Sequence, residues 1–257
     1  MKKLVIILML VASISMIGCE KAGLRLTEYT LPTDKAFVRL ALLSPGTPNV
    51  MVKANDVKIN GALSSGTGGF FPSTVTFPDY VAVDPGATIK LSLPNAGTQN
   101  DSVVIFTGKL GLEAKKYYAV TLSDTGVNRS VFAIEDAFLP QVDSFLSVRL
   151  INATVNQALT FIRIDSNSAT DVVRDTLARN VAYKASSGFI SVKTFTNRAF
   201  IRLRAVTSQG VPIAGQVIPP QTLATGSRRS ITVYTVGFAN GVTPFAPQLL
   251  TTAVTNQ

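Results

Sequence analysis

Apolar residues occupy every second position of Ala36–Leu43, near the start of the chain, and Arg39 lies between two of them. The apolar residues at every second position fall on one side of an extended segment, and Arg39 points to the other side. This pattern predicts a half-buried strand whose arginine faces solvent. A similar segment returns at Leu146–Ala153, where Arg149 takes the place of Arg39. The two opening segments therefore indicate one structural unit used twice.

Short strands separated by turn residues are expected after each opening segment. Asn60-Gly61 and Asp84-Pro85-Gly86 are turn signals, and no stretch sustains a helical period. In the first unit the predicted strands are Asn49–Lys53, Tyr80–Val83, Thr88–Leu93, Ser102–Thr107, Lys116–Leu122 and Ser130–Glu135. Strands of this length at regular spacing are typical of a β-sandwich.

Later segments repeat in the same order about 110 residues apart, which is the spacing expected of an internal duplication. Val50–Lys53 aligns with Thr160–Arg163, Ile89–Leu91 with Ile201–Leu203, and Tyr117–Leu122 with Ile231–Val236. The sequence therefore predicts an all-β protein with two tandem immunoglobulin-like β-sandwich domains. We expect them at residues 36–139 and 146–257, joined by a linker at 140–145.

The first residues of the chain have the features of an export signal. Lys2 and Lys3 precede an apolar run, Leu4–Ile14, that is too short to span a bilayer as a helix. Ser15–Cys19 follows and resembles the lipobox of bacterial lipoprotein signal peptides, with Met16 where that family usually has leucine. The alternative is an ordinary secretory signal followed by a chance cysteine.

The lipobox resemblance implies cleavage before Cys19 and acylation of its sulfur and its new amino group. Cys19 is the only cysteine of the chain, so no internal disulfide is expected. The prediction is a signal peptide at 1–18, a lipidated tether at 19–35, and a protein anchored to the outer membrane of the cell envelope. Whether it faces the periplasm or the outside stays open.

The second half also resembles a known group of repeats. The residues concerned are Val148–Ala153, Phe161-Ile162-Arg163, Tyr183 and Tyr234–Gly237. They are similar to a family of extracytoplasmic bacterial repeats, a domain of unknown function common in Bacteroidota lipoproteins. The first half departs from the motif at Ala41-Leu42, where the asparagine is missing. The resemblance implies a fold and a location but no activity.

The composition leaves little for catalysis or metal binding. The chain has no histidine, and its one cysteine is expected to carry lipid. Gly66–Gly69 lacks the Lys-Ser/Thr of a phosphate-binding loop. Glycoside hydrolysis would need two carboxylates held together, and nothing in the sequence places two together. We therefore expect a protein that is not an enzyme, with no metal and no cofactor.

An arginine-rich sheet face is the first candidate for recognition. Strand alternation in the second half places several arginines on the side away from the apolar residues, where they could bind phosphate or carboxylate. The set is Arg149, Arg163, Arg198, Arg202 and Arg204. The alternative is a solvated face that protects sheet edges.

A pair of adjacent phenylalanines is the second candidate. Phe70 and Phe71 cannot both point inward from a regular strand, so one is available for a hydrophobic contact. The alternative is that irregular backbone lets both pack inside.

Charge and location together limit the partners. Removing the signal peptide lowers the formal net charge from +9 to +7. An exported basic protein meets lipid phosphates and acidic glycans, not nucleic acid. The leading hypothesis is a non-enzymatic envelope lipoprotein with a structural or adhesion-like interaction role, whose partners are the membrane and other envelope proteins. The alternative is a binding module for anionic glycans or lipid headgroups through the arginine face.

Overall fold

The structure is a computed structural model of the chain. It describes residues 31–44, 50–59, 80–94, 100–140, 142–143, 145–165, 172–193, 200–208, 210, 221–224, 230–238 and 248–254. Thr33–Gln257 forms one compact unit. Within the described ranges, no helix has the length and apolar character needed to cross a membrane.

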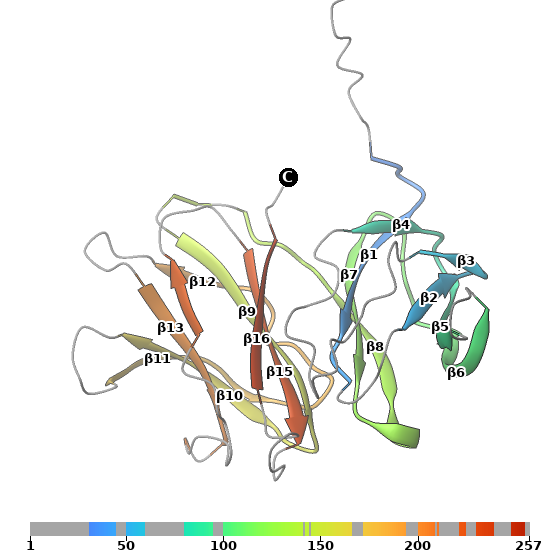
Figure 1. The fold of residues 1–257 in the computed structure, drawn as a ribbon. Coiled ribbons are helices and arrows are strands. Elements are labelled where there is room, and N and C mark those ends of the chain that lie inside the picture. The colour runs from blue at the N-terminus through green and yellow to red at the C-terminus, as the bar shows by residue number, and fades with distance from the viewer. Residues whose placement is uncertain are drawn as a thin grey trace, which may run out of the picture. The chain divides into compact units, whose positions relative to one another are not determined.

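The first half of this unit consists of two four-stranded sheets (Figure 1). Its elements are β1 (Ala36–Leu42), β2 (Met51–Ala54), β3 (Val57–Lys58), β4 (Val81–Val83), β5 (Thr88–Pro94), β6 (Asp101–Lys109), β7 (Tyr117–Ser123), the 3-10 turn η1 (Gly126–Asn128) and β8 (Ser130–Glu135). One sheet, here called the β1 sheet, has the order β4-β1-β7-β8. The other, the β2 sheet, has the order β3-β2-β5-β6.

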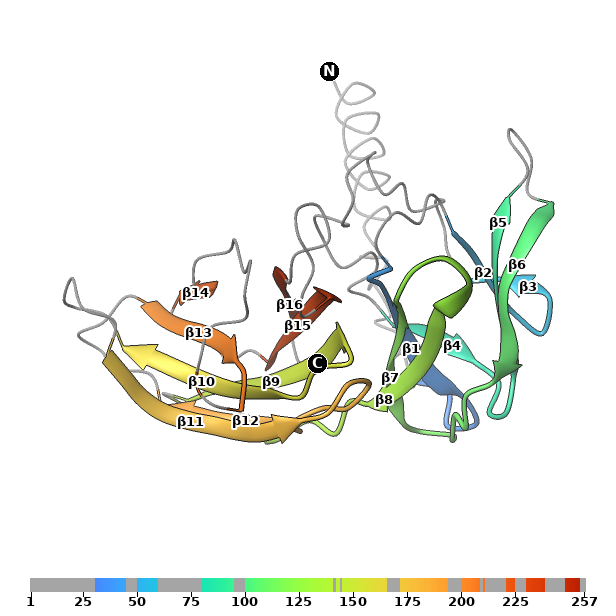
Figure 2. The same ribbon diagram turned by 90° about the horizontal axis from the view of Figure 1, so that it is seen from below.

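The second half repeats this arrangement strand for strand. Its elements are β9 (Phe145–Val155), β10 (Leu159–Asp165), β11 (Val172–Val181), β12 (Ile190–Lys193), β13 (Phe200–Val206), β14 (Gln221–Ala224), β15 (Ser230–Phe238) and β16 (Gln248–Val254). The β9 sheet has the order β12-β9-β15-β16, and the β10 sheet has the order β11-β10-β13-β14 (Figure 2). The all-β prediction is confirmed.

Both halves share an unusual feature of pairing. β1 pairs with β7 in parallel, and β9 pairs with β15 in parallel, whereas the other described strand pairs are antiparallel. The same strand order with the same parallel pair supports the interpretation that the chain contains an internal repeat.

Three apolar layers lie between the four sheets. Val38, Leu40 and Leu42 of β1 pack with residues of the β2 sheet. In the second half, the β9 and β10 sheets enclose a corresponding core. The third layer joins the halves, because it contains residues of both the β1 sheet and the β9 sheet: Ala41, Leu43, Ala119, Ile151, Ala153, Tyr234 and Val236. The β1 and β9 sheets are therefore covered on both faces.

This third layer overturns the expectation that Arg39 and Arg149 face solvent. Alternation does place both arginines opposite the sandwich core, but the other half of the molecule covers that side. Arg39 is 0% exposed and Arg149 is 1% exposed. All seven residues of β1 are buried. A strand buried on both faces is apolar at nearly every position, which is the pattern of Ala36–Leu43.

The strand register also corrects one of the repeat alignments. Val38 pairs with Tyr118, whereas Val148 pairs with Ile231. Tyr118 therefore corresponds to Ile231, and the predicted alignment that began from Tyr117 is wrong by one residue. A shift of one residue in a strand moves every side chain to the opposite face, so the sequence alignment confused core and outer positions here.

Candidate functional site

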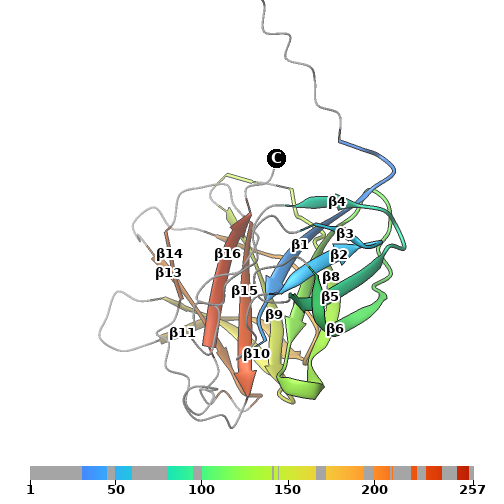
Figure 3. The ribbon, with the colours of Figure 1, turned by 45° about the vertical axis from the view of Figure 1, so that its right-hand side comes forward.

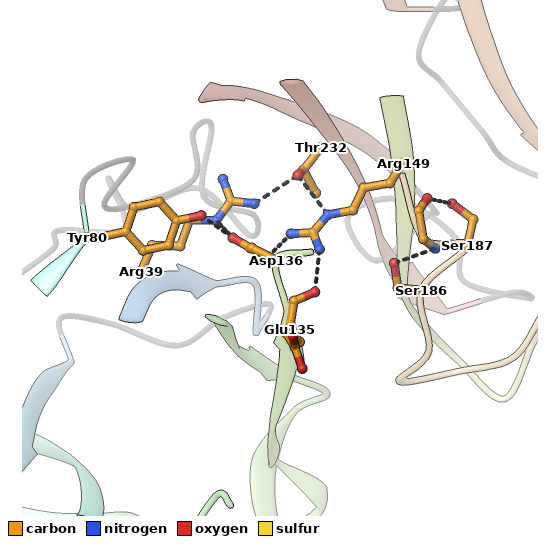
Figure 4. A network of polar contacts seen from close by, with 9 residues as sticks. Arg39, Tyr80, Glu135, Asp136, Arg149, Ser186, Ser187 and Thr232 are labelled. Carbon is orange, nitrogen blue, oxygen red and sulfur yellow. Dashed lines mark hydrogen bonds and ion pairs between the residues drawn. The ribbon is translucent and has the colours of Figure 1, made fainter. Parts of the chain in front are cut away.

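A cluster of charged side chains lies in the layer between the β1 and β9 sheets (Figure 4). Arg39 comes from β1, Arg149 comes from β9, and Asp136 follows directly after the end of β8. Arg39 Nε lies 2.9 Å from Asp136 Oδ2, and Arg149 Nη2 pairs with Asp136 Oδ1. One carboxylate thus bridges two guanidinium groups that belong to equivalent strands of the two halves.

Neutral groups complete the cluster. Thr232 Oγ1 accepts hydrogen bonds from Arg39 Nη2 at 2.8 Å and from Arg149 Nε at 3.0 Å. Arg149 Nη1 donates to the backbone oxygen of Glu135 at 3.0 Å. The hydroxyl of Tyr80 donates to Asp136 Oδ2, as Figure 4 shows. All three guanidinium nitrogens of Arg149 are therefore bonded.

The strand register explains how the cluster is assembled. Arg39 lies beside Ala119 of β7, whose small side chain leaves room for the guanidinium group. Arg149 lies beside Thr232 of β15, which brings its Nε to the threonine hydroxyl. The amide of Asp136 donates to Tyr117 O at 2.7 Å, and this bond holds the carboxylate at the end of the β1 sheet.

Five aromatic rings surround one side of this cluster. They form a continuous series of ring contacts with centroids 4.9–6.4 Å apart. The series includes residues of both halves: Phe37, Tyr80, Tyr117, Phe138 and Phe189. The guanidinium carbon of Arg149 lies 4.5 Å from the centroid of the Phe189 ring, a distance at which a cation is attracted to the ring face.

The surroundings fix the protonation of the tyrosines near the cluster. Burial raises the pKa of Tyr80 well above its ordinary value, and burial likewise raises the pKa of Tyr234. Both phenols therefore stay protonated, so Tyr80 acts as a donor to Asp136. Two guanidinium groups face one carboxylate, and the cluster carries net positive charge. Its groups bond to each other, and the arrangement is suited to joining the two sheets.

A second polar contact links the halves at Tyr183. Its hydroxyl lies 2.9 Å from Ser123 Oγ and 3.2 Å from Ser130 Oγ, both in the first half. Ser123 and Ser130 are also 3.2 Å from each other. The mid-domain tyrosine of the repeat motif therefore has a structural role in contacting the other half.

Replacing Tyr183 by phenylalanine removes these contacts and leaves the ring in place. We expect the free energy of unfolding to fall by about 1–2 kcal/mol, since Ser123 and Ser130 each lose the hydrogen bond to the tyrosine hydroxyl and, among the described residues, keep only each other. Chemical denaturation measures this change. The combined Ser123→Ala and Tyr183→Phe variant should lose less than the sum of the two single losses, and strict additivity would contradict a direct contact.

The structure separates the arginines that the sequence placed on one face. Arg149 lies in the layer between the β1 and β9 sheets. Arg163 alternates with Phe161 on the core side of β10, is 4% exposed, and lies 3.9 Å from Asp175 through its Nη1. Arg204 lies beside Ile162 on the other side of the β10 sheet and is half-buried. The prediction that Arg149 and Arg163 share an outer face with Arg204 is therefore wrong.

The remaining candidate residues fall outside what can be described. Arg202 belongs to β13, but its side chain is not among those described. Arg198, Phe70, Phe71 and Cys19 lie outside the described residues. Their predicted roles stay predictions.

Sequence reasoning missed Asp136, Tyr80 and Thr232. One signal was present: the residues on the arginine side of the opening strand, Phe37 and Leu43, are also apolar. An arginine among apolar neighbours on both faces of a strand indicates a buried charge, which requires a counter-ion. No pattern in the sequence identified Asp136 as that counter-ion, because it follows a different strand, 13 residues before Arg149, and no periodic spacing links it to either arginine.

Within the described ranges, no three His, Cys, Asp or Glu side chains are grouped as a metal site would require. No protein-family model matches the chain, and a search of curated proteins found no match either.

Proposed function

We propose that the protein is a non-enzymatic lipoprotein of the cell envelope with a structural or protein-interaction role, built from two repeats of the extracytoplasmic family that its second half resembles. The observation that carries this proposal is the buried Arg39–Asp136–Arg149 cluster. It uses the charged groups of the two halves to join them, which is the arrangement expected of a scaffold.

The cluster and the apolar layer around it hold the β1 and β9 sheets face to face. Two halves fixed in this way present their outer sheets to partners in a constant geometry. Such a body gains affinity for a partner because it loses little conformational entropy on binding. This favours a role as a spacer or interaction module near the membrane.

The proposed anchor is tested by replacing Cys19 with alanine. We expect the wild-type protein in the membrane fraction, with its signal peptide removed and with acyl chains on Cys19. The variant should remain unprocessed or leave that fraction, since durable anchoring needs several acyl chains. Met16→Leu, which restores the usual lipobox residue, is the matched control and should stay anchored. Equal partitioning of the Cys19→Ala variant and the wild type would refute the anchor.

The non-enzymatic part of the proposal has its own test. The purified protein should show no turnover of generic glycoside and ester substrates above the background without protein. Turnover that disappears in a Glu113→Gln or Glu135→Gln variant would instead establish a hydrolase and contradict the proposal.

A further inference from the structure

The outer face of the β2 sheet carries a row of lysines that no sequence motif predicted. Lys53 of β2 lies directly between Lys58 of β3 and Lys90 of β5 in the strand register. Val52, Ala54, Ile89 and Leu91 point into the sandwich core, so the lysines between them point outward. Lys109 of β6 lies beside Thr88 on the same outer face. Figure 3 shows the four strands of this sheet next to one another.

Carboxylates on this face neutralise only part of the charge. Asp101 lies between two of the lysines, 3.1 Å from Lys53 Nζ and 2.6 Å from Lys90 Nζ. The hydrogen bond from Lys90 is the main reason that the pKa of Asp101 lies well below its ordinary value. Asp56 lies 3.9 Å from Lys90 Nζ. Four lysines thus face two carboxylates, although like charges directly opposite each other in a sheet are destabilising.

Exposed apolar side chains occur on the same sheet. Val57 on the edge strand β3 is 67% exposed, and Val103 and Val104 on the edge strand β6 are 54% and 50% exposed. Val104 pairs with Ser92, which alternates with Lys90, so it lies on the face of the lysines. Val57 and Val103 pair with Ala54 and Leu93 of the core side, so these two valines lie at the edges of the other face. Basic residues accompanied by exposed apolar ones are the composition of surfaces that rest on the membrane interface.

We propose that the outer face of the β2 sheet docks on a membrane surface rich in anionic lipid headgroups. The ammonium groups would meet lipid phosphates, and Val104 would enter the boundary between headgroups and acyl chains. Lysine suits this partner because it acts as a mobile point charge, whereas arginine suits a single oriented anion. A soluble acidic glycan would use the lysines but not Val104. The predicted tether between Cys19 and β1 has few residues, which also favours a membrane partner, and this last argument alone rests on the proposed anchor.

Lysine labelling on vesicles tests the proposal with the full chain. The protein is reconstituted on vesicles of phosphatidylcholine and on vesicles of phosphatidylcholine and phosphatidylglycerol in equal parts, treated with an amine-reactive reagent, and analysed by mass spectrometry. We expect labelling of Lys53, Lys58, Lys90 and Lys109 to fall several-fold on the anionic vesicles. High salt should restore it, since exposed charges are screened. Lys115 and Lys193, which lie outside this sheet, should label equally on both.

Two double variants test whether the charge of this face is needed for membrane binding while the fold is kept. Among the described residues, no ion pair involves Lys58 or Lys109, so the Lys58→Gln and Lys109→Gln variant leaves the Asp101 contacts intact. It should lose the protection of Lys53 and Lys90 on anionic vesicles, because each lysine near such a surface strengthens binding about fivefold. The Lys115→Gln and Lys193→Gln variant is the matched control and should keep the protection.

Three results would overturn the proposal. Labelling of the four lysines could be the same on both kinds of vesicle, the Lys58→Gln and Lys109→Gln variant could retain full protection, or a soluble acidic polysaccharide could protect the lysines when anionic vesicles do not. None of these depends on acylation of Cys19, whose failure would appear as loss of lipid mass and of salt-resistant membrane association.

Discussion

Replacing Asp136 by asparagine is expected to lower the free energy of unfolding by about 3–5 kcal/mol, because it leaves two buried guanidinium groups without a counter-ion. Asparagine has nearly the shape of aspartate, so the loss comes from charge and not from packing. The side chains of Arg39 and Asp136 are 0% exposed, and that of Arg149 is 1% exposed, so water cannot compensate for the missing carboxylate. Urea denaturation followed by circular dichroism measures the change.

Asp34→Asn is the matched control for this substitution. Asp34 lies 3.5 Å from Lys35 Nζ, but its side chain is 75% exposed. Exposed ion pairs contribute little, so this variant should change the free energy of unfolding by less than about 1 kcal/mol. If Asp136→Asn proved as mild as Asp34→Asn, the buried cluster would not be holding the two sheets together.

Replacing the whole cluster with apolar residues tests whether the stability lost in Asp136→Asn comes from unpaired buried charge. The triple variant Arg39→Met, Asp136→Leu and Arg149→Met removes both charges and counter-charge together. Replacing a buried ionic group with apolar residues of similar volume is often neutral or stabilising. We therefore expect the triple variant to recover most of the stability that Asp136→Asn loses. If the triple variant were less stable than Asp136→Asn, the side chains of the cluster would stabilise the protein through packing as well as through charge.

The sequence was sufficient to predict the strands and their core residues, but it did not predict the layer between the β1 and β9 sheets. Alternation in Ala36–Leu43 correctly placed Val38, Leu40 and Leu42 in a core, because a strand's side chains must alternate between faces. Which surface covers the other face depends on how the two halves meet, and this is a long-range property. Arg39 and Arg149 were assigned to solvent because a single strand contains no information about its neighbours across a face.

Irregular strand pairing could not be predicted from the sequence either. Register shifts occur between β10 and β11 and between β5 and β6, where one strand has an extra residue opposite its partner. The extra residues lie in β11 and β6, so alternation along β10 is regular. Arg163 lies on the core side because it alternates with Leu159 and Phe161, which are core residues. The lysine row of the β2 sheet could not be predicted from the sequence, because its members come from separate strands that only the pairing brings together.

Asn152 is expected to be as sensitive as Asp136, and for a different reason. It stands where the first half has Leu42, if Val38 is matched with Val148. Its Nδ2 donates to Gln157 O at 2.6 Å and to Val181 O at 2.8 Å. Its Oδ1 accepts from Thr154 N and from Thr235 Oγ1, both at 2.9 Å. The amide thus satisfies four polar groups while it is 0% exposed.

Replacing Asn152 by the leucine of the first half removes one hydrogen bond from each of these four groups, three of them in buried contacts. Each unsatisfied group costs about 1–3 kcal/mol, so we expect the free energy of unfolding to fall by about 4 kcal/mol or more. Gln157→Ala is the control, because among the described residues the side chain of Gln157 bonds only to the neighbouring Ala158 O. Hydrogen exchange should show the loss first at the amide of Thr154, which donates to Asn152 Oδ1. If Asn152→Leu were tolerated like Gln157→Ala, the asparagine of the repeat motif would not be a structural requirement, and its role would have to be sought in binding.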